Sequence, residues 1–167
     1  MATRGKQPKE TDLAYIAGII DGEGTVGIYK KKPKNEYQSP GYRERVAISS
    51  SNLEVLNYIN KFFPGVIAKN TRYSSKHSPM FRLEYHVLRA IPILEAVSKY
   101  MIIKKKQAEK VLAYRKAITP IDPKKSKSFG PQRLSSKEIA LRESYYQELK
   151  KLNLRGVQPQ RLIRATT

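Results

Sequence analysis

Two carboxylates lie close together in a short stretch near the N-terminus. Residues 16–24 run Ile-Ala-Gly-Ile-Ile-Asp-Gly-Glu-Gly, and the apolar residues that begin at position 13 predict a helix leading into it. Asp21 and Glu23 would then lie at the C-terminal end of this helix, where the helix dipole disfavours negative charge. The chain has only 14 acidic residues, and placing two of them here breaks a local rule. Such violations tend to mark functional sites.

The chemistry open to these carboxylates depends on a second helix. Ala14 and Gly18 are four residues apart, with Ala17 beside them, so this helix could pack closely against another one. A symmetric partner helix would bring two copies of Glu23 together, and two facing carboxylates repel each other unless a hard cation lies between them. Mg²⁺ binds a few carboxylates together with phosphate oxygens, which suits metal-assisted phosphodiester hydrolysis. A capped, buried helix end without a metal is the alternative interpretation, and this pattern alone favours neither.

The chain as a whole is strongly basic. It contains 33 Lys and Arg against 14 Asp and Glu in 167 residues, a formal net charge of +19. Such a charge attracts phosphate backbones through counterion release, without sequence preference. The absence of Cys excludes disulfides, thiolate nucleophiles and Cys-containing zinc sites, and two His offer little for a metal. The apolar run at residues 13–20 is too short to span a bilayer, so we expect an intracellular protein with no membrane segment and no signal peptide.

The hydropathy pattern predicts the elements that must position these residues. Helices are expected from residue 11 or 12 to about 20, at 53–63, at 88–99 and at 104–118, and strands at 25–32, 43–49, 66–73 and 80–87. This order predicts an α+β fold over residues 11–118, with an αββαββα core and a curved antiparallel four-stranded sheet. Around it we expect a basic arm at 1–10, a basic linker at 119–134, a C-terminal helix at 135–153 capped by Ser135 with Glu138, and a basic tail at 154–167.

One face of the predicted sheet is a candidate nucleic-acid surface. Helices would cover its apolar face, and the other face would carry side chains able to reach phosphates and base edges if the sheet lay in a major groove. These are Tyr29, Lys31, Arg43, Arg45, Lys69 and Arg82. An ordinary solvated face is the simpler interpretation, but the basic bias of these strands favours DNA or RNA as the partner.

Residues 16–24 resemble the LAGLIDADG signature, with Ile at positions 16 and 19, Gly at 22 and Glu at 23. The expected order of elements after them resembles the core of the LAGLIDADG homing endonucleases. One copy of the motif is visible, and single-motif members of that family act as homodimers whose motif helices pack together. The resemblance therefore implies a nearly palindromic double-stranded DNA target, and it places Ala14, Ala17, Gly18 and Asp21 at the dimer interface.

The resemblance also implies roles for individual residues. Glu23 would be the metal-binding carboxylate, the Gly22 carbonyl a second metal contact, and Asp21 a structural residue of the helix end. Lys104 would lie at the edge of the active site and polarise the hydrolytic water or stabilise phosphate charge, with Lys105 and Lys106 as alternatives under a shifted alignment. A helix start that only faces phosphate is the alternative interpretation of the lysine run.

Two positions depart from the family pattern, and rival functions remain. Ser50 stands where the family often has a longer polar side chain, and Glu54 stands where a related enzyme carries a basic residue. The leading hypothesis is a double-strand DNA endonuclease that depends on Mg²⁺, with Mn²⁺ as an alternative ion. The rivals are an intron-splicing maturase that binds RNA, a non-cleaving DNA-binding protein of the same fold, and a general basic binder such as a ribosomal protein.

Overall fold

The computed structural model describes residues 7–33, 35, 37–70, 79–118 and 134–154. The expected α+β class and the αββαββα order are confirmed. Two 3₁₀ turns, η1 (Val87–Arg89) and η2 (Ser98–Tyr100), flank the third helix. The main elements are α1 (Glu10–Glu23), β1 (Gly24–Lys31), β2 (Gly41–Ser50), α2 (Leu53–Phe62), β3 (Val66–Asn70), β4 (Met80–His86), α3 (Ala90–Val97), α4 (Lys105–Ala117) and α5 (Ser136–Leu152). Most of the predicted N-terminal arm, and all but one residue each of the predicted linker and tail, lie outside the described residues.

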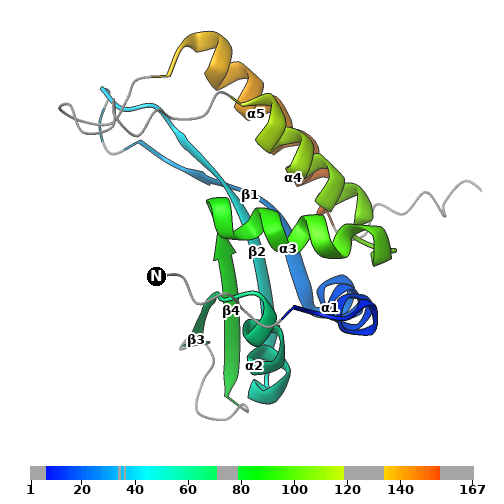
Figure 1. Cartoon of the computed structure of the whole chain (residues 1–167). Helices are drawn as coiled ribbons and strands as arrows, with labels where there is room; N and C mark the ends of the chain where they lie inside the picture. Colours follow the sequence, from blue (N-terminus) through cyan, green and yellow to red (C-terminus); the bar gives the residue numbers. More distant parts are fainter. Residues whose placement is uncertain (1–6, 34, 36, 71–78, 119–133, 155–167) are drawn as a thin grey trace, which may run out of the picture.

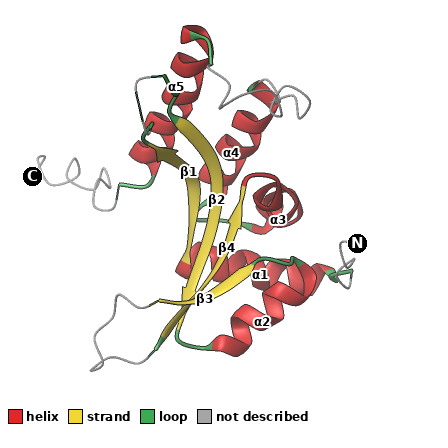
Figure 2. Cartoon of the chain, turned by 90° about the vertical axis from the view of Figure 1, so that its left-hand side faces the viewer, coloured by secondary structure: helices red, strands yellow, loops and turns green. Residues whose placement is uncertain are grey.

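The four strands form one antiparallel sheet in the order β1-β2-β4-β3. Helices α1 to α4 lie on one side of it (Figure 1), and the view in Figure 2 faces the other, open side, across which the strands curve. The strands β1 and β2 continue past the end of β4 towards α5 (Figure 2). One face of the sheet is therefore free of helices.

Apolar side chains alternate with other residues along the strands, so one face of the sheet is buried under the helices and the other is open. Val26, Val46 and Leu83 are fully buried and point to the helices, where they pack with Ile16 and Ile20 of α1. Burying these apolar side chains is the main stabilising term of the fold. The motif helix is thus fixed to the sheet by its own apolar residues.

The junction between α1 and β1 requires a glycine. The strand starts at Gly24, directly after the last residue of the helix, with no linker between them. A Cβ atom at this position would lie 2.5 Å from the carbonyl oxygen of Ile20, closer than any side chain tolerates. This close approach holds Glu23 at a fixed corner between helix and sheet.

The first helix is longer than predicted. It begins at Glu10, one residue before the expected N-cap, and the Asp12 carboxylate accepts a hydrogen bond from the Lys9 backbone N–H at 2.8 Å. It also continues through Gly22 to Glu23 rather than ending at the first glycine. Both acids of the motif therefore belong to the last turn of α1.

The C-terminal helix α5 is part of the same fold. It packs on α4 and on the far ends of β1 and β2, and Leu149 is 1% exposed. The Ser135 hydroxyl accepts from the Glu138 N–H, as predicted for a helix start. The Glu143 carboxylate accepts from Lys30 Nζ at 2.7 Å and from the Tyr42 hydroxyl, which ties α5 to both strands.

None of the helices in the described ranges has the length and apolar composition needed to cross a bilayer.

Candidate active site and nucleic-acid interface

Asp21 connects the end of the motif helix to the start of α4. Its Oδ2 accepts from the backbone N–H groups of Ile102 at 2.6 Å and Ile103 at 3.1 Å, and its Oδ1 accepts from that of Lys104 at 2.9 Å. Lys104 is the N-cap of α4, and Ile102 and Ile103 lie in the turn before it, so the Asp21 carboxylate satisfies backbone N–H groups that no helix or strand pairs. Asp21 is 7% exposed and occupied on both oxygens, the environment of a structural residue.

The same contacts fix the charge of Asp21. Burial alone raises the pKa of a carboxyl group, but the three backbone hydrogen bonds and the nearby Lys104 ammonium lower it by more. The net effect holds the pKa of Asp21 below its usual range. The residue is therefore ionised at neutral pH and is unsuited to act as a general acid.

Lys104 makes the reciprocal contact. Its Nζ donates to the carbonyl oxygen of Ile20 at 3.1 Å and to the carbonyl oxygen of Asp21, both in the last turn of α1. A cation at this position stabilises the negative end of the helix dipole. Of the three lysines in the run, the structure thus brings Lys104 to the motif, whereas Lys105 and Lys106 are exposed on the first turn of α4.

Glu23 has the opposite environment to Asp21. It is exposed at the corner between α1 and β1, and within the described residues no hydrogen bond or ion pair engages its carboxylate. Gly22, next to it, is also exposed. A carboxylate oxygen and a backbone carbonyl oxygen are the hard ligands that Mg²⁺ prefers, so these two residues fit such an ion. The described part of the chain contains no group of three or more His, Cys, Asp or Glu side chains that could hold a metal ion.

The predicted interface residues of α1 fall into two groups. Ala17 is fully buried and Asp21 nearly so within their own chain, whereas Ala14 and Gly18 are exposed. A Cβ atom at Gly18 or at Gly22 would meet nothing within 4 Å. Glycine inside a helix is about 1 kcal/mol less favourable than alanine, and nothing in the described chain requires it at these positions. The face formed by Ala14, Gly18 and Gly22 is thus free to receive another helix.

The open face of the sheet carries most of the predicted nucleic-acid residues. Tyr29 lies opposite Arg43 on the neighbouring strand, and the Arg45 guanidinium lies 5.9 Å from the centre of the Tyr29 ring. Tyr29, Lys31 and Arg43 are exposed, and Arg45 and Arg82 are half-buried. Five of the six predicted side chains therefore share the curved face seen in Figure 2.

Lys69 is the exception, and its predicted placement on this face is wrong. It lies opposite Phe81, on the side of the sheet that the helices cover, whereas its neighbour Ala68 lies opposite Arg82. Successive residues of a strand point to opposite faces, so an error of one residue in the phase moves a side chain across the sheet. In the run Val66-Ile67-Ala68 the apolar residues are consecutive, so the sequence does not define the phase of β3.

The sequence reasoning assigned no role to Glu84, which lies among the arginines of the open face. Its Oε1 is 2.5 Å from Nη2 of Arg45 and 2.7 Å from Nε of Arg82, and its Oε2 is 2.9 Å from Nε2 of His86. The signal was present in the alternation Arg-Glu-His at positions 82, 84 and 86. The pairing with Arg45 could not be foreseen, because it depends on the register between β2 and β4.

The two positions that depart from the expected motif pattern flank the turn from β2 to α2: Ser50 ends the strand, and Glu54 lies in the first turn of the helix. The Ser50 hydroxyl accepts from the Asn52 N–H at 3.0 Å, and the Asn52 side chain accepts from the Glu54 N–H at 2.9 Å. Ser50 thus stabilises the turn, and the Glu54 side chain is exposed.

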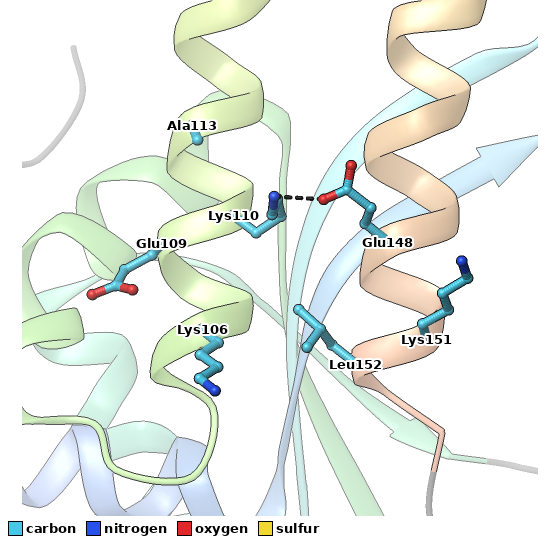
Figure 3. Close-up of a pocket in the computed structure, with 7 residues that line it drawn as sticks. All are labelled: Lys106, Glu109, Lys110, Ala113, Glu148, Lys151 and Leu152. Atoms are coloured by element: carbon cyan, nitrogen blue, oxygen red, sulfur yellow. Dashed lines mark hydrogen bonds and ion pairs between the residues drawn. The ribbon is translucent and has the colours of Figure 1, made fainter. Parts of the chain in front are cut away.

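A pocket lies between α4 and α5, on the helical side of the molecule (Figure 3). An ion pair between Lys110 and Glu148, 2.5 Å apart, crosses it. Lys106 lines the pocket, but no residue predicted for the metal or for the sheet face does so. Its lining residues are Lys106, Glu109, Lys110, Ala113, Glu148, Lys151 and Leu152.

The model of a known family, the LAGLIDADG endonucleases, matches residues 16–118. No curated protein matches the sequence significantly. Among solved structures, the archaeal intron-encoded homing endonuclease I-Vdi141I, complexed with DNA, superposes with a TM-score of 0.67 at 17% identity, covering 90% of this chain and 89% of that chain. The homing endonuclease I-CvuI, in complex with its target and calcium, gives a TM-score of 0.57 at 19% identity over 85% of this chain and 94% of that one.

A third structure differs in length. I-SmaMI, bound to an uncleaved DNA target with calcium ions, gives a TM-score of 0.58 at 19% identity over 86% of this chain but only 46% of its own. At these sequence identities the similarity shows a shared fold only. Because the superposition covers 46% of I-SmaMI, the fold of this chain corresponds to about half of that protein.

Proposed function

Because the chain belongs to the LAGLIDADG endonuclease family, we propose that it is a site-specific homing endonuclease. Acting as a homodimer with a divalent metal ion, it hydrolyses both strands of a long, nearly palindromic DNA duplex. The observation that carries this proposal is the end of the motif helix. There Asp21 and Lys104 fix the last turn through contacts to α4, and Glu23 is left exposed beside them.

The homodimer is supported by the motif helix and by chain length. One chain offers a single exposed Glu23, and the face of Ala14, Gly18 and Gly22 has open space above it. The fold also corresponds to about half of I-SmaMI, so a second copy of this chain would supply the other half. Two motif helices packed on these small residues would bring two Glu23 carboxylates to the symmetry axis.

The metal proposal rests on the donor atoms. The Glu23 carboxylate and the Gly22 carbonyl of each chain would hold Mg²⁺, with Mn²⁺ as an alternative. A bound divalent ion would polarise the scissile phosphate and lower the pKa of a coordinated water. The protein's own contributions are to orient Glu23 through the Gly24 corner and to place the Lys104 ammonium near developing phosphate charge. The DNA complexes of I-CvuI and I-SmaMI were both solved in the presence of calcium, which supports a requirement for a divalent ion in this proposal.

The DNA would lie along the open face of the sheet. A curved β-ribbon fits the major groove, where arginine makes bidentate contacts with guanine. Tyr29, Lys31, Arg43, Arg45 and Arg82 are the contacts we propose on this face.

The test first selects the DNA duplexes that the protein binds and then asks whether the protein cleaves them. The purified protein is first used to enrich duplexes from a random library in Ca²⁺, and the enriched pool is then incubated with Mg²⁺ or EDTA before the released ends are sequenced. We expect one two-fold-related consensus that is cut near its centre only with Mg²⁺. Enrichment of a consensus without any cut would support the non-cleaving alternative. A protein that enriches no duplex but retains structured RNA would instead be acting as a maturase.

A further inference from the structure

Glu84 is the one acidic residue on the open face of the sheet among the described strands. A carboxylate at this position repels DNA phosphates and lowers the non-specific attraction that the basic face provides. Glu84 also lies on β4, an inner strand of the sheet, rather than at an edge. A carboxylate at this position weakens DNA binding by the sheet, so we expect a compensating role in its contacts with the neighbouring basic side chains.

Glu84 holds three basic side chains at once. Arg82 and His86 flank it on β4, and Arg45 reaches it from β2. Arg45 also lies against the Tyr29 ring of β1, so the cluster crosses three strands. A single carboxylate therefore restrains both half-buried arginines of the open face.

Partial burial makes these contacts stronger than ordinary surface pairs. The side chain of Glu84 is 24% exposed, and those of Arg45 and Arg82 are 29% and 32% exposed. Burial raises the pKa of Glu84, but the hydrogen bonds from Arg45 and His86 and the charges of Arg45 and Arg82 lower it by more. The carboxylate is ionised at neutral pH and remains an acceptor.

We propose, resting on the proposed function, that Glu84 is a positioning residue that sets base specificity. It holds the guanidinium groups of Arg45 and Arg82 in orientations from which they donate to guanine edges in the major groove. Arginine has five N–H donors, and Glu84 engages one nitrogen of each guanidinium, so donors remain for a base. A guanidinium that is already oriented loses less conformational entropy when it meets its base, and it fits other bases less well.

Removing this carboxylate has two effects of opposite sign. Glu84→Gln deletes a negative charge from the DNA face, so the non-specific, electrostatic part of the affinity rises for every duplex. The two arginines lose the carboxylate with which both form ion pairs, so discrimination between duplexes falls. Loss of an ordinary DNA contact would lower affinity for the target without raising affinity for other sequences.

The experiment compares two isosteric variants of the full chain, Glu84→Gln and Glu95→Gln. Glu95 is exposed on α3, on the helical side, so the control makes the same change in net charge away from the open face. Dissociation constants are measured in Ca²⁺ for the consensus duplex selected by the wild type and for a scrambled duplex of equal length. The thermal midpoint of each variant shows that it is folded.

For Glu84→Gln we expect the dissociation constant of the scrambled duplex, divided by that of the consensus duplex, to fall at least about tenfold. The reason is that arginines without a fixed orientation make weaker bidentate contacts with their bases. The scrambled duplex should bind about two- to fivefold more tightly through the removed charge. Glu95→Gln should leave the ratio within about twofold. When Arg45 and Arg82 are both replaced by Ala, Glu84→Gln should no longer change the ratio, which a merely structural role would not predict.

An unchanged ratio in Glu84→Gln, with only a general gain in affinity, would overturn this inference while leaving the proposed function intact. Failure of the wild type to select any consensus would instead overturn the proposed function, and the role of Glu84 with it.

Discussion

Asp21 and Glu23 are two residues apart on the same helix turn, yet their environments are opposite. Asp21 is buried and accepts three backbone hydrogen bonds from the start of α4, and Glu23 faces solvent. The sequence singled out both acids, and the family resemblance suggested which one is structural. Local spacing could not establish it, because the N–H groups that occupy Asp21 come from residues about eighty positions further along the chain.

Asp21→Asn tests the structural role of the buried carboxylate. The amide would direct an NH₂ group at backbone N–H donors and lose the charge that strengthens these bonds. We expect the free energy of unfolding to fall by about 1–3 kcal/mol. Urea denaturation measures it, and Glu95→Gln should change it by less than about 0.5 kcal/mol. Equal stability of Asp21→Asn and the wild type would show that the α1–α4 contact contributes little.

Glu143 gives the fold a stability that depends on pH. Hydrogen bonds from Lys30 and Tyr42 lower the pKa of Glu143 to about 2, below the ordinary value of 4.5. A carboxyl whose pKa is lower in the folded state stabilises the fold above its unfolded pKa, and this stability is lost as pH falls from about 4.5 towards 2.

Glu143→Gln should therefore be about 1 kcal/mol less stable at pH 7, after allowance for solvent screening, and should lose less stability between pH 5 and pH 2 than the wild type. Denaturation midpoints measured across this range test it. Glu148→Gln is the control on the same helix, since Glu148 is 50% exposed and its ion pair with Lys110 is largely screened. Parallel stability curves for wild type and Glu143→Gln would contradict the assignment.

At the scale of elements, the match to the family ends at residue 118, but the fold does not. The helix α5 buries Leu149 against α4 and the sheet, and its Asn153 side chain donates to the Val26 carbonyl of β1 at 3.0 Å. The chain therefore uses a helix beyond the family core to cover the ends of its longest strands.

Leu149→Ala tests whether α5 is required. Removing a buried leucine side chain leaves a cavity, and we expect a loss of about 2–4 kcal/mol in the free energy of unfolding. Leu154→Ala, at a position that is 57% exposed, should cost less than about 0.5 kcal/mol. Calorimetry of the two variants compares them directly. If both substitutions lowered the free energy of unfolding by less than about 0.5 kcal/mol, α5 would not be part of the cooperative folding unit.

Most elements could be predicted because their periodicity is strong, and the errors have local causes. The predicted helix at 88–99 is interrupted by 3₁₀ turns at both ends, and it follows Val87, whose φ of 51° is unusual for a β-branched residue. The phase of β3 was undefined because three apolar residues are consecutive. Neither a strained backbone angle nor a strand phase is encoded in hydropathy alone.

At the scale of the whole molecule, the candidate sites are assembled from distant parts. Arg45 and Glu84 meet only because β2 and β4 are neighbours in the sheet. In the metal site that we propose, two chains would each contribute a Glu23. The basic composition predicted the class of partner, and the motif predicted where the chemistry lies. The acid that restrains the arginines required the strand register, which the sequence does not provide.

Gly18→Gln tests the homodimer. Nothing in the described chain lies near this position, and glutamine has a higher helix propensity than glycine, so the monomer should keep or gain up to about 1 kcal/mol of stability. The side chain would prevent close approach of a second helix. We expect a dimeric wild type and a folded, monomeric variant in sedimentation equilibrium. Ala117→Gln, at the exposed end of α4, should remain dimeric. A dimeric Gly18→Gln would place the interface elsewhere.

The most direct measurement is single-turnover cleavage of the selected target by wild type and Glu23→Gln in Mg²⁺, with binding of both proteins measured in Ca²⁺. Since Glu23 is exposed and makes no hydrogen bond or ion pair among the described residues, its replacement should leave the protein folded and its dissociation constant for the target within about threefold of the wild type. Loss of a metal ligand should slow cleavage of both strands by about a thousandfold or more. Cleavage by Glu23→Gln at the wild-type rate would contradict the account.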